Sequence, residues 1–291
     1  MTIIAAFPYG KKDRSALHLA GLFARSSGED VRIVSIVPEQ GRSMIPSGSD
    51  LQFAAWSRER GRKAVAEAQR AAAEICPDIE TESVAVPHRS RAKGLIAEVV
   101  AKNASMLVVG SGTEGTRGRI RVSGTSDRLL HSSPVPVALA PKGLVTEPGA
   151  QIARVTCSFR GDSGSDRVLA KTAEISQSVD AALRVATFGV GGRTVEPSSL
   201  EEDSRRREYA AHLKAIQARA VDKVDEDIPV EEAVGIGKDW KAALGAIDWM
   251  SGEVLVIGSS SEGRRSKVFL GSNAARIIRH TPAPVVVVVV P

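Results

Sequence analysis

The sequence has little cysteine and no long apolar segment. Only Cys76 and Cys157 occur, and neither belongs to a C-x-x-C pair, so the pattern supports neither a disulfide framework nor a zinc site. The longest apolar run, 285–290, falls far short of the roughly 20 residues that a membrane-spanning helix needs. No charged segment precedes a long apolar stretch at the N-terminus, as a secretory signal would require. These absences predict a cytoplasmic protein with no membrane association.

Histidine and aromatic residues are also scarce, at five histidines and 4% aromatic residues. No histidine lies at ligand spacing from a cysteine or a pair of carboxylates, so no metal is expected. Positive charge is in excess only in residues 1–148, which carry 20 Lys and Arg against 15 Asp and Glu, while the remainder carries 19 against 19. The dense basic patch of residues 1–148 consists of Arg117, Arg119 and Arg121. It lacks the interleaved aromatic residues of proteins that bind single-stranded nucleic acid. We therefore expect no nucleic-acid partner.

Sequence motifs for catalysis are missing or out of context. There is no G-x-x-x-x-G-K-[ST] and no G-x-S-x-G after a strand. Residues 110–115 match G-x-G-x-x-G, but they run into TRGRIRVSG rather than directly into a helix. Residues 161–166 faintly resemble a pyrophosphate-binding loop, although a turn capped by Ser or Asp before a helix is the simpler interpretation. The sequence therefore predicts a protein that is not an enzyme.

The sequence does contain an internal repeat. Its 291 residues correspond to about two domains of roughly 100–200 residues. Residues 255–289 align without a gap on 107–141, an offset of 148. Such a long period is that of a whole domain rather than a solenoid repeat. We therefore expect two copies of one unit, with domains at 1–145 and 146–291 and a Pro- and Gly-containing linker over 141–150.

Each copy alternates apolar strands with helices, which predicts a doubly wound α/β domain with a five-stranded, mostly parallel sheet covered on both faces. The strands expected in the first copy are 3–7, 31–37, 80–86, 106–110 and 135–140, and its helices are 15–26, 50–76, 90–103 and 126–132. The strands expected in the second copy are 154–159, 183–189, 229–236, 254–258 and 285–290, and its helices are 165–178, 200–224, 238–250 and 273–280.

The loop after the fourth strand of each copy is the candidate binding site. Ligands of open parallel sheets bind beyond the carboxyl ends of the strands. In the second copy small residues follow that strand, and the next helix opens with small residues whose free amides would face an anion. An ordinary strand-to-helix turn is the alternative. The candidate residues in this loop are Gly258, Ser259, Ser261, Gly271, Ser272 and Asn273.

The segments VLVIGSSSEGRRSKVFLGSNAARIIRHTPAPVVVV and LVVGSGTEGTRGRIRVSGTSDRLLHSSPVPVALAP resemble the universal stress protein family in its tandem, two-domain form. In ATP-binding members the loop reads G-x-x-G, nine residues, then G followed by S or T. The second copy matches this pattern except that Ser261 replaces the second glycine. The first copy matches less well, with Gly110, Thr113 and Ser123, although Gly124-Thr125 follows one residue late.

The resemblance also implies where the rest of a nucleotide would lie. The ends of the second strands, Ile36 to Val37 and Thr187 to Phe188, would flank an adenine. ATP-binding members place an Asp after the first strand, whereas this sequence has Pro8 and Arg160. Arg160 could add positive charge near a phosphate.

The resemblance implies a non-catalytic stress-response regulatory module that holds an adenine nucleotide such as ATP, mainly in the second copy. A ligand-free scaffold or oligomerisation protein is the alternative, and an adenylating or ATP-hydrolysing enzyme is a third. The resemblance further implies that 135–140 and 285–290 pair within the chain, which would cover the aggregation-prone valine run. The helices expected at 50–76 and 200–224 remain available for a homodimer, and any protein partner is unidentified.

Overall fold

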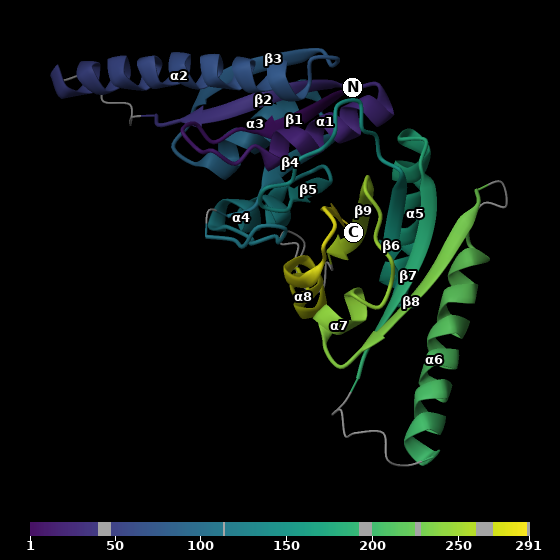
Figure 1. Ribbon diagram of the computed structural model, residues 1–291. Coiled ribbons are helices and arrows are strands. Elements are labelled where there is room, and N and C mark those ends of the chain that lie inside the picture. The colour runs from purple at the N-terminus through teal and green to yellow at the C-terminus, as the bar shows by residue number, and fades with distance from the viewer. Residues whose placement is uncertain (40–47, 113, 192–199, 225–227, 260–269, 290–291) are drawn as a thin grey trace. The chain divides into compact units, whose positions relative to one another are not determined.

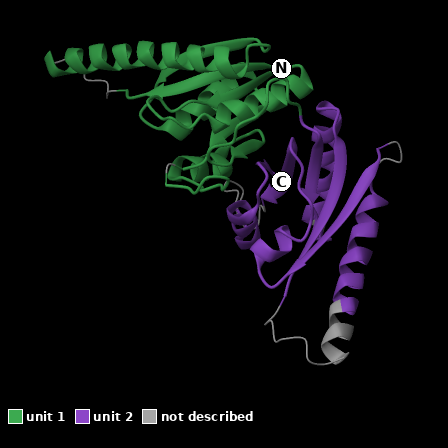
Figure 2. Cartoon of the chain, viewed as in Figure 1, with its two compact units in different colours: residues 1–151 green, residues 152–291 purple. Residues whose placement is uncertain are grey.

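The computed structural model describes residues 1–39, 48–112, 114–191, 200–224, 228–259 and 270–289 (Figure 1). The chain divides into two compact units, residues 1–151 and 152–291 (Figure 2). This division lies a few residues beyond the boundary at 145 that the sequence analysis proposed.

Unit 1 contains a five-stranded sheet in the order β3-β2-β1-β4-β5. All neighbouring strands in it are parallel. Its strands are β1 (Thr2–Ala6), β2 (Asp30–Val37), β3 (Thr81–Pro87), β4 (Met106–Gly110) and β5 (Val137–Ala140), and its helices are α1 (Ser15–Ser27), α2 (Gly48–Ile75), α3 (Arg91–Lys102) and α4 (Gly124–Ser132).

Helices cover both faces of this sheet. A methyl group at Gly61 of α2 would lie 3.2 Å from the Ala85 side chain, and one at Gly94 of α3 would lie 2.8 Å from Ile36 Cδ1. Ala85 is paired with Ser35, the residue next to Ile36. Because successive side chains of a strand point to opposite faces, α2 and α3 lie on opposite faces of the sheet.

Unit 2 repeats the arrangement in the order β10-β9-β6-β7-β8, again with parallel neighbours. The fold class expected from the sequence, two doubly wound α/β units, is confirmed. The strands of unit 2 are β6 (Arg154–Ser158), β7 (Ala182–Val190), β8 (Val230–Gly237), β9 (Glu253–Ser259) and β10 (Val285–Val289), and its helices are α5 (Ser163–Ser178), α6 (Leu200–Val221), α7 (Trp240–Leu244) and α8 (Ser272–His280).

The expected helix over 238–250 is much shorter in the structure. The observed helix α7 ends at Leu244, with Gly245 as its C-cap. A methyl group at Gly235 would lie 2.3 Å from the Ala243 carbonyl oxygen, and one at Gly237 would lie 2.3 Å from the Ala243 amide. The backbone of α7 therefore lies directly on two glycines of β8. Trp249, expected on the same helix, instead follows it and donates from its indole to the Leu244 carbonyl at 2.7 Å.

The central strands of each unit form its core. Ile4 and Leu107 in unit 1, and Val155 and Leu255 in unit 2, are fully buried. Burial on both faces explains the near-continuous apolar strands of the sequence. Among the described helices, none combines the length and the apolar character that crossing a bilayer would take.

Candidate functional site

The candidate site of unit 2 lies where its strand order changes direction. β6 pairs with both β7 and β9, and the chain leaves these strands toward opposite edges of the sheet. The carboxyl ends of β6 and β9 therefore flank the crevice in which ligands of such sheets bind. Two helices begin beside it, α5 after β6 and α8 at Ser272. The groups available at these helix N-termini decide what the crevice can hold.

The N-terminus of α8 has no side-chain cap. Its N-cap residue is Gly271, with φ −58° and ψ 155°, and among the described residues no side chain accepts a hydrogen bond from the first turn. Ser272 is exposed, and Gly271 and Asn273 are half-buried. The first amides of a helix have no partner within the helix, and the helix dipole makes this end attractive to an anion. The structure thus presents uncapped amides from three of the predicted site residues.

The N-terminus of α5, in contrast, is closed by an acidic side chain. Asp162 accepts from the Ser165 amide at 2.7 Å and from the Ser165 hydroxyl at 2.5 Å. The Ser165 hydroxyl also accepts from the Asp162 amide at 3.2 Å, which completes a capping box. The simpler interpretation of residues 161–166, a capped turn, is confirmed.

Arg160 is engaged by the same carboxylate. Its Nη2 lies 2.9 Å from Asp162 Oδ2, and both side chains are about half exposed, at 55% and 50%. Burial raises the pKa of Asp162, but the hydrogen bonds from Ser165 and the charge of Arg160 outweigh it and hold that pKa below its usual range. Arg160 is thus at the carboxyl end of β6, as the sequence indicated, but its charge is already paired.

The other predicted residues of unit 2 are in different environments. The Ser259 hydroxyl is buried and donates to the Val288 carbonyl at 3.1 Å, so it is used within the sheet. Gly258 is half-buried in β9. Ser261 lies outside the described residues.

Thr187 and Phe188 are adjacent in β7 and therefore point to opposite faces of the sheet. Gly189, on the same face as Thr187, lies against Tyr209 and Leu213 of α6. Phe188 packs against Trp240 of α7, with ring centroids 6.5 Å apart. The two side chains therefore do not come together around one ligand. The Thr187 hydroxyl is buried without a hydrogen-bond partner among the described residues.

In unit 1 the equivalent helix N-terminus is capped by its own chain. Ser123 is the N-cap of α4, and its hydroxyl accepts from the Ser126 amide at 3.1 Å. Gly124 is exposed and Thr125 is half-buried in the first turn. Thr113 lies outside the described residues. The Ser123 hydroxyl thus already partners one of the first amides of α4.

The loop that follows Gly110 in unit 1 is closed by internal hydrogen bonds. The Gly112 amide donates to the Arg121 carbonyl at 2.8 Å, and the Arg121 amide donates to the Ser111 hydroxyl at 2.8 Å. Arg121 also pairs with Glu114 at 3.0 Å. These backbone amides are therefore already partnered.

The N-terminus of α1 is partnered as well. Asp13 Oδ1 accepts from the Ser15 amide at 3.0 Å, and the Ser15 hydroxyl accepts from the Leu144 amide at 3.1 Å. Of the helices that begin beside the two crevices, α1, α4, α5 and α8, only α8 thus has no side-chain acceptor at its N-terminus among the described residues.

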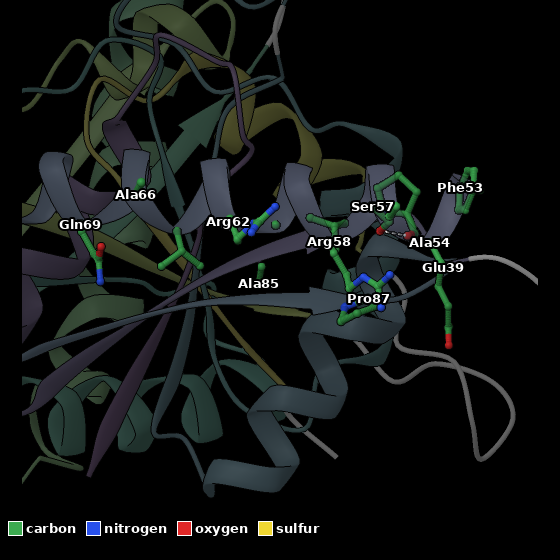
Figure 3. Close-up of a pocket in the computed structure, with 15 residues that line it drawn as sticks. Glu39, Phe53, Ala54, Ser57, Arg58, Arg62, Ala66, Gln69, Ala85 and Pro87 are labelled. Carbon is green, nitrogen blue, oxygen red and sulfur yellow. Dashed lines mark hydrogen bonds between the residues drawn. The ribbon is translucent and has the colours of Figure 1, made fainter. Parts of the chain in front are cut away.

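Unit 1 also has a groove of about 950 Å³ between α2, β3 and the end of β2 (Figure 3). Val37 and Pro38 line its end, and the charged side chains on its largely apolar wall are Arg58 and Arg62 of α2 and Glu39. The Ser57 hydroxyl donates to the Pro38 carbonyl at 2.6 Å and so joins α2 to the end of β2. Ile36, expected beside an adenine with Val37, faces α3 on the other side of the sheet.

The two thiols are not reactive groups of a site. Burial raises the pKa of Cys76 to about 11 and that of Cys157 to about 12. A thiol with such a pKa carries very little thiolate at neutral pH and is a poor nucleophile and metal ligand. In the described part of the chain, His, Cys, Asp and Glu form no group of three or more that could hold a metal ion.

The sequence analysis missed a buried ionic cluster at the opposite, amino ends of the strands in unit 2. Glu253 of β9 has no exposed side-chain surface and pairs with Arg154 of β6 at 2.8 Å and with Arg184 of β7. The Thr156 hydroxyl also donates to Glu253. Burial lowers the pKa of Arg184 and the Glu253 charge partly restores it. In the sequence, the arginines within otherwise apolar strands could have indicated this cluster. The cluster joins three strands away from the crevice.

Comparison with known proteins identifies the family. The sequence model of the universal stress protein family matches residues 2–141 and again residues 153–289. The chain belongs to the universal stress protein family. It is a tandem member, because each unit matches the family once. Curated universal stress proteins of Mycobacterium tuberculosis and Mycobacterium bovis are each 35% identical to it over 292 aligned residues, which cover 99% of both chains.

Solved structures of similar fold support the same architecture. A universal stress protein of Pseudomonas aeruginosa superimposes with a TM-score of 0.57 at 16% identity, over 99% of this chain and 92% of its own. One from Archaeoglobus fulgidus gives a TM-score of 0.54 at 18% identity, over 98% of this chain and 97% of its own. At these identities the likeness concerns the α/β fold.

Proposed function

We propose that this tandem universal stress protein is a non-catalytic regulatory module that binds an adenine nucleotide, ATP above all, in unit 2. The observation that carries the proposal is the N-terminus of α8, where Gly271 supplies no cap and no other side chain in the described part of the chain accepts from the first amides. A triphosphate would supply the missing acceptor and would interact favourably with the helix dipole. The crevice between β6 and β9 is the place where doubly wound folds bind nucleotides.

Unit 1 is expected to bind nucleotide weakly or not at all. Ser123 caps α4, and the amides of Gly112 and Arg121 are used within the loop. An incoming phosphate would have to break these hydrogen bonds and would gain little from the exchange. The two copies thus differ in this proposal, because unit 2 binds the nucleotide and unit 1 does not.

The nucleotide is held rather than turned over in this proposal. Asp162, the carboxylate next to the crevice, is engaged by Ser165 and Arg160, and its lowered pKa makes it a weak base. Ligand binding would stabilise unit 2 by mass action and shift its population toward the bound form. A protein partner in the cytoplasm would then recognise that form. Pairing of β5 with β10 within the chain, and a homodimer, remain part of the proposal.

The variant Gly271→Asp tests the nucleotide site without relying on loss of folding. The backbone of Gly271 is extended and suits an aspartate N-cap, which is more favourable than glycine at this position by about a few tenths of a kcal/mol. The added carboxylate would occupy the α8 amides and repel a phosphate. We expect unchanged or higher thermal stability together with loss of ATP binding in calorimetric titration.

The matched control is Ser123→Asp at the N-cap of α4 in unit 1, which should leave ATP binding unchanged. Purified wild-type protein should also release nucleotide on denaturation, detected by chromatography and mass spectrometry. Equal ATP affinity in wild type and Gly271→Asp would refute the site. An empty wild-type protein with no titration heat would favour the ligand-free scaffold, and ADP accumulating with time would favour an enzyme.

A further inference from the structure

Aromatic residues are scarce in this chain, yet two of them contact one arginine on unit 1, and a third packs against one of these two. The guanidinium carbon of Arg60 lies 5.0 Å from the centre of the Tyr9 ring and 5.5 Å from that of Trp56. The rings of Phe53 and Trp56 are 5.4 Å apart and tilted by 46°. The guanidinium thus contacts two aromatic rings, the arrangement of a double cation–π interaction.

The fold brings these residues together from two segments. One face of α2, defined by a spacing of three and four residues, contains Phe53, Trp56, Arg60, Lys63 and Glu67. Glu67 fixes the loop after β1 beside this face, because it accepts from the Gly10 amide at 3.3 Å and pairs with Arg14. Tyr9, next to Gly10, is thereby held against Arg60. We refer to Tyr9, Phe53, Trp56, Arg60 and Lys63 as the Trp56 face.

The Trp56 face carries two cations, Arg60 and Lys63; Trp56 and Lys63 are exposed, and its other members are half-buried. Trp56 is 48% exposed, and the side chain of Lys63 is 61% exposed. Lys11 and Lys12 are exposed in the adjoining loop. Within the described residues Arg60 makes no ion pair, and Glu59 is the carboxylate that pairs with Lys63, at 3.6 Å. One end of α2 extends past the strands of unit 1 (Figure 1).

We propose that the Trp56 face binds single-stranded nucleic acid. Exposed rings stack on unpaired bases, and lysines and arginines neutralise the phosphates between them, which is how sequence-tolerant single-strand sites work. No nucleic-acid partner was expected from the sequence, because its dense basic segment contains no interleaved aromatic residues. The fold creates that combination by placing Tyr9 beside α2.

The chemistry of the face favours this partner over a membrane. Leu51, another exposed apolar residue of α2 at 63%, lies five positions before Trp56 and therefore about 140° away around the helix at about 100° per residue. The exposed apolar groups thus do not form the single stripe that an interfacial helix inserts into lipid. The exposed Trp56 ring beside the cations Arg60 and Lys63 complements an unpaired base and its neighbouring phosphates.

The test is fluorescence anisotropy with labelled oligouridine of about 16 nucleotides, the upper site size of a single-strand binding fold. We expect Trp56→Ala to weaken binding about tenfold or more, since base stacking accounts for that range, and Trp56→Phe to restore most of it. Arg60→Gln should also weaken binding, by about fivefold. Arg91→Gln, on α3 across the sheet, is the charge-matched control and should bind as wild type. Circular dichroism of each variant checks that it folds.

Two further measurements complete the test. A duplex of equal length should bind more weakly, because its bases are already stacked. Lys63→Gln should reduce the slope of log affinity against log salt by about 0.7, the value for one phosphate contact on a single strand. Binding by Gly271→Asp should be unchanged, which separates this face from the nucleotide site. No binding near 50 mM salt, duplex binding as tight as single strand, or equal losses in Trp56→Ala and Arg91→Gln would overturn the proposal.

Discussion

Replacing Glu253 by Gln removes the one carboxylate that joins three strands at the amino edge of unit 2. Glu253 is buried and receives hydrogen bonds from Arg154 at 2.8 Å, from the Met250 amide at 3.1 Å, and from Arg184 and Thr156. Glutamine keeps the shape of the side chain but leaves the two guanidinium groups without their shared negative charge. The variant therefore isolates the electrostatic part of the cluster.

The expected loss of stability depends on which hydrogen-bond partners Arg154 and Arg184 retain in the variant. Breaking a buried pair by removing one partner typically costs about 3–5 kcal/mol. Arg154 keeps Glu231 at 2.7 Å, and Arg184 keeps the Asp248 carbonyl at 2.7 Å. We therefore expect the lower end, about 3 kcal/mol of the free energy of unfolding of unit 2. With an m-value of about 1–3 kcal/mol per molar urea, the midpoint should fall by at least about 1 M.

Urea unfolding followed by tryptophan fluorescence measures this change. Trp240 and Trp249 lie in unit 2, and Trp249 packs on Arg184 with a guanidinium-to-ring distance of 5.2 Å. In a Trp56→Phe background the fluorescence therefore reports on unit 2 alone. Glu231→Gln is the control, because Glu231 makes an exposed pair that should contribute under about 1 kcal/mol. A Glu253→Gln variant within about 0.5 kcal/mol of its background, the range of ordinary surface substitutions, would refute the reasoning.

Two further predictions concern a helix cap and the valine strand. Asp162→Asn keeps an N-cap side chain but removes the charge that pairs with Arg160. In the wild type the pKa of Asp162 is lowered by folding. The stability that the ionised carboxylate contributes is therefore complete above the unfolded pKa of about 3.9 and is lost as the pH falls through the folded pKa. The stability difference between wild type and Asp162→Asn in urea unfolding should therefore shrink from pH 7 toward pH 3, and a gap that widens on acidification would contradict this. The same variant frees Arg160 and should tighten ATP binding in titration; weaker binding would show that Arg160 does not face the phosphates. Val287→Lys places a charge at a side chain that is 2% exposed and should lower the thermal midpoint by many degrees or yield aggregates in size-exclusion chromatography, whereas unchanged melting of a monodisperse protein would remove the role given to this strand.

Periodicity and apolar runs in the sequence were sufficient to predict the elements of both units, because strands buried on both faces and capped helices have strong local signals. Helix α3 illustrates this, since the expected 90–103 became Arg91–Lys102 with Ser90 as its N-cap. Helix α7 shows the limit. Its alanines and tryptophans favoured a long helix, but packing on Gly235 and Gly237 of β8 is a tertiary contact that no local pattern encodes.

The candidate site could be located from the sequence but not resolved in detail. The glycine-rich loops and the switch point follow from strand order, so Gly271, Ser272 and Asn273 could be named in advance. That Asp162 would hold Arg160, and that Ser259 would be used by the sheet, depends on side-chain geometry. The Trp56 face was not foreseen for the same reason, because Tyr9 and Trp56 come to the same arginine only in the folded chain.

The most direct test of the central claim is an ATP titration of ¹⁵N-labelled protein followed by amide chemical shifts. The account predicts that the largest shift changes occur at the amides of Ser272, Asn273 and Ala274 in α8, with little change at Gly124, Thr125 and Ser126 in α4. Changes confined to α4, or no changes in α8 at saturating ATP, would contradict it.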